Sequence, residues 1–584
     1  MSLIKANAVQ IGQSNDATDN FTLAVPSSPD GTIKLARGNS GATTQDVMNV
    51  SNAGVVSFPQ GFSGNASSST ALATGSTAAR PLANRFADVV NVKDFLCSDG
   101  LPVAGDGVHD DTTGIQAAIN QAQLSNTSSV VYIPSTIYSY RTTNTLNITK
   151  AIKILGDGIN GFLYPGIEQK NSRLFFDHLN IGIKISTDYN PSGCVIDGIE
   201  TKRNQPIPSS TYPTPWTPIA ADYDISADEL SGIDLTIRNC LIRNATNGIK
   251  ILRSGRASIF NVKLHAFNTG IYIDRSGDVC RIENTHIYPM WIFNDNIFDY
   301  MRQNLTALFS GRNDNPHVTN FFAWGIKYGI HLGTGTGPSP AITKRFLLSQ
   351  FGIDEIGDTA ILISGNESTA QITNGYSTLG NHGIVVTASH TKLVVSNYRS
   401  TNNDLSAIKI LGGDNDAQFT GITLDLYNNS NTAGQTAIYA DPLNRVYVDG
   451  KLIATTTGTE DKINSYSSIE SNEWFDYTPT VRSTVGTITS YTASGKIRRQ
   501  AGTISYYYVI IITNAGTGSG DLLVGIPYQS LSYACGNGQE TTSLDQIYAR
   551  LSPAQPEVVV RKYDGSSVVG TGKTVVLEGE YIIQ

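Results

Sequence analysis

Short stretches of alternating apolar and polar residues dominate the chain from residue 124 to about 460. Within them a Gly or Ala followed by Ile recurs as an anchor, at Gly182-Ile183, Gly248-Ile249, Gly270-Ile271, Gly329-Ile330, Ala360-Ile361, Gly383-Ile384, Ala407-Ile408 and Ala437-Ile438. From Gly248 onward, successive anchors are 22, 59, 31, 23, 24 and 30 residues apart. A repeat in the low twenties with alternating β-branched residues predicts stacked β-coils about 4.8 Å apart. An array of β-sandwiches, the alternative, would not require one repeat length to persist for so long.

Residues 112–124 carry a helical period instead. Their apolar positions recur at i, i+3, i+4 and i+7, at Ile115, Ala118, Ile119 and Ala122. Asp110 and Asp111 precede this stripe, and their side chains can accept hydrogen bonds from the first N–H groups of a helix. His109 beside them also suggests a metal site. Because helix capping accounts for both carboxylates, we predict no metal here.

Two long segments interrupt the repeat. Residues 204–228 are rich in proline and aromatic residues and must leave the coil as a loop. Residues 291–324 include a helical stretch with Ile297, Met301 and either Leu305 or Leu308 on one face. Long insertions on a rigid scaffold are common places for function. We therefore expect the functional site near these two insertions.

The two ends of the chain differ from its middle. Residues 1–80 are polar and end in a run of small residues typical of a linker or slender neck, with a disordered leader as the alternative. Residues 81–123 lead into the repeat, which we place at 124–465, and residues 474–584 form a separate β-rich domain. In that domain Tyr506-Tyr507-Tyr508 is either a sugar-stacking face or part of a sheet core or a subunit contact.

Composition narrows the function classes. The net charge of −8 argues against a general nucleic-acid binder, and no apolar run approaches the length of a membrane span. The five cysteines are scattered without a CxxC pair, so we expect small buried thiols in a reduced compartment. The N-terminus has no apolar signal-peptide core, which predicts synthesis in a cytoplasm. Without a phosphate loop, metal-binding Cys/His spacing or GxSxG motif, we predict no cofactor.

Two motifs resemble one known superfamily. FADVVNVKDF (86–95) followed by GDGVHDDTTGIQAAIN (105–120) closely resembles the opening segment of pectate-lyase-like right-handed β-helix proteins, above all bacteriophage tailspikes. RIENTHIYPMW (281–291) resembles a segment of many depolymerase tailspikes, and the leader more weakly resembles their virion-attachment end. The usual tight turn is replaced here by Leu96-Cys97-Ser98-Asp99, a departure that affects the cap and not the chemistry.

This resemblance implies a fold and a function. The fold would be all-β, a right-handed parallel β-helix with an N-terminal capping helix and a C-terminal β-sandwich, assembled as a homotrimer. The function would be that of a tailspike depolymerase on the virion tail, which joins the tail, baseplate or an adaptor protein through its N-terminus and cleaves a bacterial surface polysaccharide. The alternatives are a polysaccharide lyase on the same fold and a receptor-binding fibre without catalysis. Neither nucleic-acid binding nor membrane insertion is expected.

The predicted chemistry is glycoside hydrolysis, which needs one carboxylic acid and one carboxylate as base or nucleophile. Aligning the coils on their anchors places Ile282 on the inward-facing Ile259, so Glu283 should point outward just before the second insertion. Glu283 is therefore the predicted acid. Asp295 and Asp299 are four residues apart on the predicted helix, share one face, and compete as the base.

The substrate-binding residues predicted from the same region combine cations, aromatic rings and acids. They are Arg281, His286, Tyr288, Trp291, Arg302, Arg253, Arg275, Asp354 and Glu355. Residues 238–281 hold eight basic and two acidic side chains, which favours an anionic capsule-type glycan gripped by arginine. His286 and Tyr288, paired with Arg281 or Arg302, could equally serve a lyase that removes a proton beside a uronate carboxylate.

Overall fold

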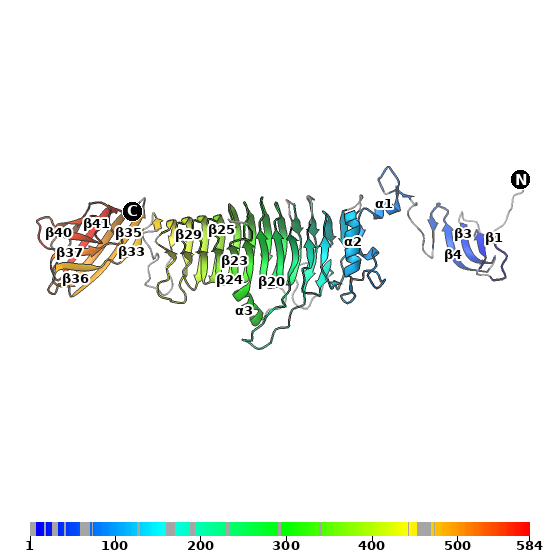
Figure 1. Ribbon diagram of the computed structural model, residues 1–584, viewed down its shortest axis with the longest axis horizontal. Helices are drawn as coiled ribbons and strands as arrows, with labels where there is room; N and C mark the ends of the chain where they lie inside the picture. Colours follow the sequence, from blue (N-terminus) through cyan, green and yellow to red (C-terminus); the bar gives the residue numbers. More distant parts are fainter. Residues whose placement is uncertain are drawn as a thin grey trace. The chain divides into compact units, whose positions relative to one another are not determined.

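The chain forms two compact units, Met1–Asp88 and Val89–Gln584, in the computed structural model (Figure 1). The structure describes residues 8–16, 19–25, 33–39, 42–58, 70–72, 74–124, 129–158, 170–186, 193–228, 234–289, 294–337, 342–441, 443–452, 469–471, 474–500 and 502–583.

The first unit contains a five-stranded antiparallel sheet in the order β1-β2-β3-β4-β5. Its strands are β1 (Ala8–Ile11), β2 (Phe21–Ala24), β3 (Ile33–Asn39), β4 (Ala42–Val50) and β5 (Val56–Ser57). A short pair, β6 (Thr70–Ala71) with β7 (Arg80–Pro81), and the helix α1 (Leu82–Phe86) follow. The described part of the leader is therefore folded, against the disordered alternative.

The second unit begins with a solenoid of parallel strands that stack in three series (Figure 1). The first series contains β8 (Val90–Asn91), β9 (Val130–Ile133), β12 (Lys153–Gly156), β15 (Val195–Asp197), β18 (Thr236–Arg238) and β32 (Ile469–Ser471). The second contains β10 (Tyr140–Thr142), β13 (Arg173–Phe176) and β16 (Glu200–Lys202). The third contains β11 (Leu146–Ile148), β14 (Ile183–Ile185), β17 (Tyr223–Asp228), β22 (Thr306–Ser310), β26 (His382–Val386), β28 (Ile408–Ile410) and β30 (Ile438–Ala440).

Other strands turn a corner and serve more than one series. They are β19 (Leu241–Leu252), β20 (Ser258–Asp274), β21 (Arg281–Ile287), β23 (His317–Leu332), β24 (Phe346–Ile363), β25 (Thr369–Gly380), β27 (Lys392–Asn403), β29 (Asp416–Asp425) and β31 (Arg445–Leu452). Each pairs in parallel with the strand of the next coil, for example Ile259 of β20 with Ile282 of β21. This pairing confirms the predicted β-coils.

The predicted anchors form one continuous row in the third series. Together with Ile225 and Leu308, their isoleucines are in register from coil to coil and at most 1% exposed. The full row is Ile183, Ile225, Ile249, Ile271, Leu308, Ile330, Ile361, Ile384, Ile408 and Ile438. Full burial of each such side chain stabilises the solenoid by about 1.5–3 kcal/mol. Glycine is needed as the first residue of an anchor where the coils approach closely, because a Cβ on Gly270 would lie 2.4 Å from the carbonyl oxygen of Ala307.

Two boundaries of the predicted insertions are wrong. The row includes Ile225 and Leu308, so residues 223–228 and 306–310 are strands of the solenoid rather than loop. The 59-residue gap between anchors therefore hides a complete coil whose anchor is Ala307-Leu308. The helix α3 (Asp295–Asn304) confirms the predicted helical stretch, with Ile297 and Met301 buried. Leu305 caps its C-terminus and Leu308 lies beyond it.

The helix α2 (Thr112–Leu124) lies at the first coil of the solenoid (Figure 1), after the 3-10 turn η2 (Val92–Asp94). Its predicted stripe is buried, since Ile115, Ala118 and Ile119 are 0% exposed. Gln116 accepts a hydrogen bond from the backbone N of Asn147 at 2.7 Å and donates to its carbonyl oxygen at 3.0 Å. A helix that covers the open edge of a first coil would make such contacts, because edge strands leave backbone groups unpaired.

Only one of the two predicted capping carboxylates binds the helix. Asp110 accepts from the backbone N of Thr112 at 3.1 Å. Asp111 instead accepts from the backbone N atoms of Ala104 and Gly105, at 2.8 and 3.0 Å. Helix capping therefore explains Asp110, whereas Asp111 holds the loop before the helix.

The C-terminal part of the second unit is a nine-stranded antiparallel sheet, ordered β33-β35-β36-β41-β38-β39-β40-β37-β34. Its strands are β33 (Phe475–Tyr477), β34 (Val481–Val485), β35 (Ser490–Gln500), β36 (Thr503–Asn514), β37 (Ser519–Gly525), β38 (Ala534–Glu540), β39 (Asp545–Leu551), β40 (Glu557–Lys562) and β41 (Lys573–Ile582). Successive residues of β36 alternate between faces, so Tyr506 and Tyr508 are buried and only Tyr507 is exposed. The three tyrosines therefore cannot form one sugar-stacking face. A division into two packed sheets stays a prediction.

All five cysteines are free thiols. Four are buried, as predicted, but Cys535 on β38 is exposed. Burial raises the pKa of Cys240 and of Cys280 to about 12, so both stay protonated thiols inside the solenoid. Within the described ranges, no helix has both the length and the apolar character needed to span a membrane.

The stacked isoleucine row gives a first testable expectation. Replacing Ile271 by Ala should lower the free energy of unfolding by about 2–5 kcal/mol, because the neighbouring coils cannot collapse into the cavity. The change is measured by denaturant unfolding. Gln418→Ala, an exposed position on β29, is the control and should be nearly silent. Equal effects of the two substitutions would contradict the assignment of Ile271 to the core.

Candidate functional site

The first and second series meet at a single residue with positive φ in eight successive coils. These corner residues are Asn239 (53°), Asn261 (51°), Asn284 (50°), Asn320 (49°), Gln350 (52°), Asn374 (54°), Asn397 (49°) and Gly421 (62°). Asparagine and glycine tolerate this left-handed conformation. Asn244 also has positive φ, whereas Asn247 and Asn268 do not belong to this group, so asparagine takes this conformation at some positions only.

The corner asparagines form a hydrogen-bonded ladder. The Nδ2 of Asn261 donates to Oδ1 of Asn239 at 2.9 Å, and Asn284 donates to Asn261 at 3.1 Å. Asn320 continues the ladder to Asn284 at 2.9 Å. Each amide thus fixes the corner of the next coil, and the side chains on either side of the corner are held in straight rows.

A hollow of about 780 Å³, here called the ladder groove, follows these corners from Asn320 to Gly421. Its wall is the outward row of the second series, in which Phe322, Gly352, Tyr376, Arg399 and Thr423 pair in register. The small residue in this row makes room for an aromatic ring, because a Cβ on Gly352 would lie 2.8 Å from the ring of Tyr376.

The ladder groove combines aromatic, amide and charged groups. Tyr376 is 40% exposed, and burial together with the charge of Asp354 raises its pKa. Arg399 donates through Nη2 to Asp425 at 2.9 Å. The other oxygen of Asp425 is buried and accepts no hydrogen bond within the described residues. Rings that stack and polar groups that bind hydroxyls make this a surface suited to a sugar chain.

Glu283 lies at the start of this surface. Its neighbour Ile282 is buried and in register with Ile259, which confirms the predicted alignment and the outward direction of Glu283. Glu283 pairs in register with Thr319, the residue before the first corner of the ladder groove. Arg281, two residues earlier, is exposed on the same strand.

His286 and Tyr288 stand on the other side of the same corner. The ring of His286 lies 4.4 Å from that of Tyr288 and 4.6 Å from that of Phe322. Burial lowers the pKa of His286 to about 4, with a smaller effect from the charge of Lys263. Burial also raises the pKa of Tyr288. The imidazole is therefore uncharged at neutral pH and is able to accept a proton.

Asp295 and Asp299 lie on α3, which projects beside the solenoid (Figure 1). The helix is locked to the first insertion by Asn296, whose Oδ1 accepts from Thr214 N at 2.7 Å and whose Nδ2 donates to Ser209 and Thr211. We call residues 203–222 and α3 together the arm.

Within the arm, Asp299 accepts a hydrogen bond from the hydroxyl of Tyr212 at 2.6 Å. It lines a hollow of about 230 Å³ together with Trp216 and Tyr300. No hydrogen bond or ion pair joins Asp295 or Asp299 to Glu283 in the part of the chain that the structure describes. The predicted acid and bases therefore come from separate elements.

The remaining predicted binding residues divide between sites. Arg302 lies 4.0 Å from Glu355 and above the ring of Phe298, which ties α3 to β24. Asp354, the residue before Glu355, adjoins the ladder groove through its effect on Tyr376. Trp291 lies outside the described residues.

Arg253 and Arg275 do not line the ladder groove. Arg253 pairs with Asp228 at 3.0 Å, and Arg275 donates through Nε to the carbonyl oxygen of Thr336, so both lie at the corner between the third and first series. The sequence analysis did not identify Phe322, Tyr376 and Arg399. If all coils had been aligned on their anchors, these three residues would have fallen in one outward row.

The basic excess of residues 238–281 is largely neutralised by acids from other coils. Arg238 pairs with Asp197 at 2.8 Å, and Arg243 with the buried Glu200 at 3.0 Å. Arg256 pairs with Asp234. These acids lie before residue 238 in the sequence and were therefore outside the count of charges. Because these arginines are paired, they no longer favour an anionic glycan.

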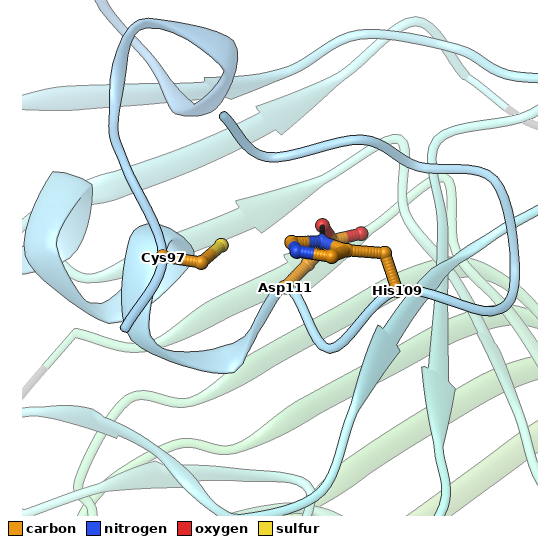
Figure 2. A group of neighbouring side chains, drawn as sticks. All are labelled: Cys97, His109 and Asp111. Carbon is orange, nitrogen blue, oxygen red and sulfur yellow. Dashed lines mark hydrogen bonds and ion pairs between the residues drawn. The ribbon is translucent and has the colours of Figure 1, made fainter. Parts of the chain in front are cut away.

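Figure 2 shows a group that offers three potential metal ligands, Cys97, His109 and Asp111. Hydrogen bonds already occupy the side-chain atoms of His109 and Asp111. His109 binds Asp111 through Nδ1 at 2.8 Å and Asp99 through Nε2 at 2.9 Å, and both oxygens of Asp111 also accept backbone N–H groups. These hydrogen bonds explain the arrangement as a polar clamp between two loops. That the site holds no metal stays a prediction.

Residues 89–177 match the family described as rhamnogalacturonase A/epimerase, pectate lyase-like. The stacked parallel coils give this chain the fold of a parallel β-helix. The solved structure of a tailspike protein mutant of E. coli bacteriophage HK620 in complex with a pentasaccharide covers 88% of this chain and 98% of its own, at 10% identity and a TM-score of 0.53.

Two further solved structures resemble this chain at lower TM-scores. The Dettilon tailspike protein is 14% identical and covers 89% of this chain and 98% of its own, with a TM-score of 0.48. The A-module of the Azotobacter vinelandii mannuronan C-5 epimerase AlgE4 is 15% identical. It covers 66% of this chain and 99% of its own, with a TM-score of 0.35. No curated protein matches the chain in sequence.

The clamp of His109 predicts a pH-dependent stability. Its hydrogen bonds to Asp111 and then Asp99 raise the pKa of His109 above the usual value. The clamp therefore stabilises the fold fully below a pH of about 6.5 and loses this effect as the pH rises through the raised pKa. The melting temperature of His109→Gln should fall furthest below that of the unmodified protein near pH 6 and approach it near pH 9.

The control for the clamp is His390→Gln, which removes an exposed histidine 3.5 Å from Asp414. Its melting temperature should follow that of the unmodified protein across the same range. A deficit of His109→Gln that is the same at every pH would show that the charged imidazolium does not support the fold.

Proposed function

We propose that this chain is a phage tailspike depolymerase that binds and cleaves a bacterial surface polysaccharide. The observation that carries the proposal is the ladder groove, an open hollow of about 780 Å³ with Phe322, Tyr376 and Arg399 in one row beside a ladder of amides. Because the coils repeat at a fixed spacing, an extended polymer meets similar groups along its length. The groove begins one coil after Glu283, which places a carboxylate at its end.

Hydrolysis is the proposed reaction. Glu283 is the proposed general acid, because a strand of the solenoid holds it outward and a rigid element keeps a catalytic group in place. Asp295 and Asp299 are the proposed bases. Of the two, Asp299 is oriented by the hydroxyl of Tyr212, so its carboxylate is positioned before any substrate arrives.

A lyase is the second candidate, and His286 is the observation in its favour. An imidazole with a pKa of about 4 is a neutral base at physiological pH. It would abstract the proton beside a uronate carboxylate, while Lys263 or Arg281 nearby would neutralise that carboxylate. A receptor-binding fibre without catalysis is the third candidate, and the ladder groove alone would serve it.

The proposed setting is the virion tail. Residues 1–80 would join the tail, the baseplate or an adaptor protein, three copies of the chain would assemble side by side, and the solenoid would reach the bacterial surface. The antiparallel sheet of the first unit supports this division of labour, because it folds as a unit separate from the solenoid.

Glu283→Gln tests the catalytic assignment. The substitution keeps the shape of the side chain but removes proton donation, so cleavage of the capsule glycan should fall by on the order of 10²-fold while binding persists. Cleavage is measured as new reducing ends. Asp414→Asn, an exposed acid away from the groove, is the control and should cleave at the normal rate. Unchanged cleavage by Glu283→Gln would move the acid elsewhere.

The products separate hydrolysis from elimination. A hydrolase releases reducing ends without ultraviolet absorbance, whereas a lyase leaves an unsaturated uronate that absorbs. We expect no absorbance. If ultraviolet absorbance grows during digestion and His286→Ala abolishes it, the protein is a lyase rather than a hydrolase. If neither product forms on any encapsulated host tested, the chain is a binding fibre.

Tyr376→Ala tests the groove itself. Loss of one stacking ring should weaken glycan binding by roughly tenfold, measured by calorimetry in the Glu283→Gln background. The matched control is Tyr563→Ala, another exposed tyrosine, in the turn after β40 of the C-terminal sheet. Equal affinities of the two variants would contradict the ladder groove as the binding surface.

A further inference from the structure

The corner between the third and first series carries a second hollow, of about 380 Å³. Three consecutive coils build it. Ser276 pairs with Asn313, and Asp314 pairs with Lys344, as isolated parallel bridges that stack the coils directly. Each of these coils contributes one cation to the lining, namely Arg275, Arg312 and Lys344.

A buried carboxylate fixes the shape of this corner. Asp274 is 0% exposed and accepts from the backbone N of Arg312 at 2.7 Å. Its other oxygen accepts from the backbone N and hydroxyl of Thr336 at 2.7 and 2.6 Å. Gly311 and Gly335 leave the space that this carboxylate needs, because a Cβ on either would lie within 2.5 Å of it. The backbone that carries Arg275 and Arg312 is therefore rigid.

A buried amide supports the same corner. Asn313 donates through Nδ2 to the carbonyl oxygen of Ile273 at 3.0 Å and to Ser310 at 2.8 Å. Its Oδ1 accepts from the backbone N of Ser276 at 3.0 Å. The hollow therefore has a preorganised floor of hydrogen-bonded backbone beneath the cationic side chains.

The positive charge of this hollow is only partly neutralised. Lys344 lies 3.6 Å from Glu367, and Asp314 is held by Arg345, which stands outside the lining. Arg275 uses its Nε for the carbonyl oxygen of Thr336. In the part of the chain that the structure describes, the guanidinium of Arg312 makes no ion pair. Counted with their partners and with the buried Asp274, four cations face three carboxylates, in a chain whose net charge is −8.

We infer that this hollow, here called the basic corner, binds the carboxylates of an acidic sugar chain. Guanidinium groups bind carboxylates through two parallel hydrogen bonds, and a lysine adds a point charge. Arg275 and Arg312 are in register on neighbouring coils about 4.8 Å apart, and Lys344 lies on the third coil in register with Asp314. Cations spread over three coils suit a polymer with repeated acidic groups better than a single small anion. The inference rests on the proposed function for its class of ligand and assigns acid recognition to a different corner from the ladder groove.

The basic corner also explains how an acidic polymer could be held while the ladder groove remains nearly neutral. Arg399 in that groove is paired with Asp425, and Asp354 adds a further negative charge beside Tyr376. An acidic chain gains little electrostatic attraction there. At the basic corner the guanidinium of Arg312, which makes no ion pair within the described residues, supplies this attraction.

The test is calorimetric titration of the whole protein with tetragalacturonate, maltotetraose and inorganic phosphate. We expect binding of the acidic tetrasaccharide that weakens with added salt, and no binding of the neutral one at this corner. The double variant Arg312→Gln, Lys344→Gln should bind the acidic tetrasaccharide roughly tenfold or more weakly. Arg445→Gln, an exposed arginine on β31 paired with Asp416, is the matched control and should bind normally.

Each contrary outcome identifies a different error. Undiminished binding by the double variant overturns the basic corner. Binding of phosphate without binding of the acidic tetrasaccharide overturns the sugar ligand and leaves a phosphate site. If the double variant melts early, Arg312→Glu alone replaces it, since Arg312 is exposed. None of these measurements requires cleavage, so a failed Glu283→Gln experiment would not be confused with a failure here.

Discussion

Register between coils is the constraint on which the rest of this structure depends. Parallel backbone pairing locks each coil to the next, and the inward row from Ile183 to Ile438 makes any slip costly, because a shift of one residue would turn every buried isoleucine outward. The same lock determines the outside of the solenoid. When the inside row is straight, the outward side chains also form straight rows, and a surface built from rows is suited to a long polymer.

The corners convert this regularity into two chemically different sites. At the corner between the first and second series, one residue with positive φ per coil gives a sharp bend, and amide-to-amide hydrogen bonds repeat it. The ladder groove follows that bend. At the corner between the third and first series the chain takes a longer path, and there Asp274 and Asn313 organise the backbone from within. One solenoid thus presents an aromatic and amide surface at one corner and a cationic one at another.

Charge balance in a solenoid operates between coils and not along the chain. Arg238, Arg243 and Arg253 each find an acid one or two coils away, 41, 43 and 25 residues earlier in the sequence. A count of charges over a stretch of sequence therefore overstates the field at the surface. Arg312 escapes this pairing within the described residues, and that distinguishes the basic corner from the neutralised arginines that precede it.

The sequence by itself determined the coils, the helix α2 and the outward direction of Glu283. Periodicity carries that information locally, because an inward isoleucine every coil must be written into the chain. It could not reveal the coil at Leu308, whose anchor has Leu in place of Ile and follows α3 without the usual spacing. Nor could it separate Arg275 from Glu283, which are eight residues apart in sequence but lie on either side of a corner. Only the tertiary structure decided which rows of side chains line a groove and that Asp299 faces Tyr212 on the arm. It also decided which cations are left without a neighbouring acid. Each of these depends on neighbours that stacking brings from distant parts of the chain.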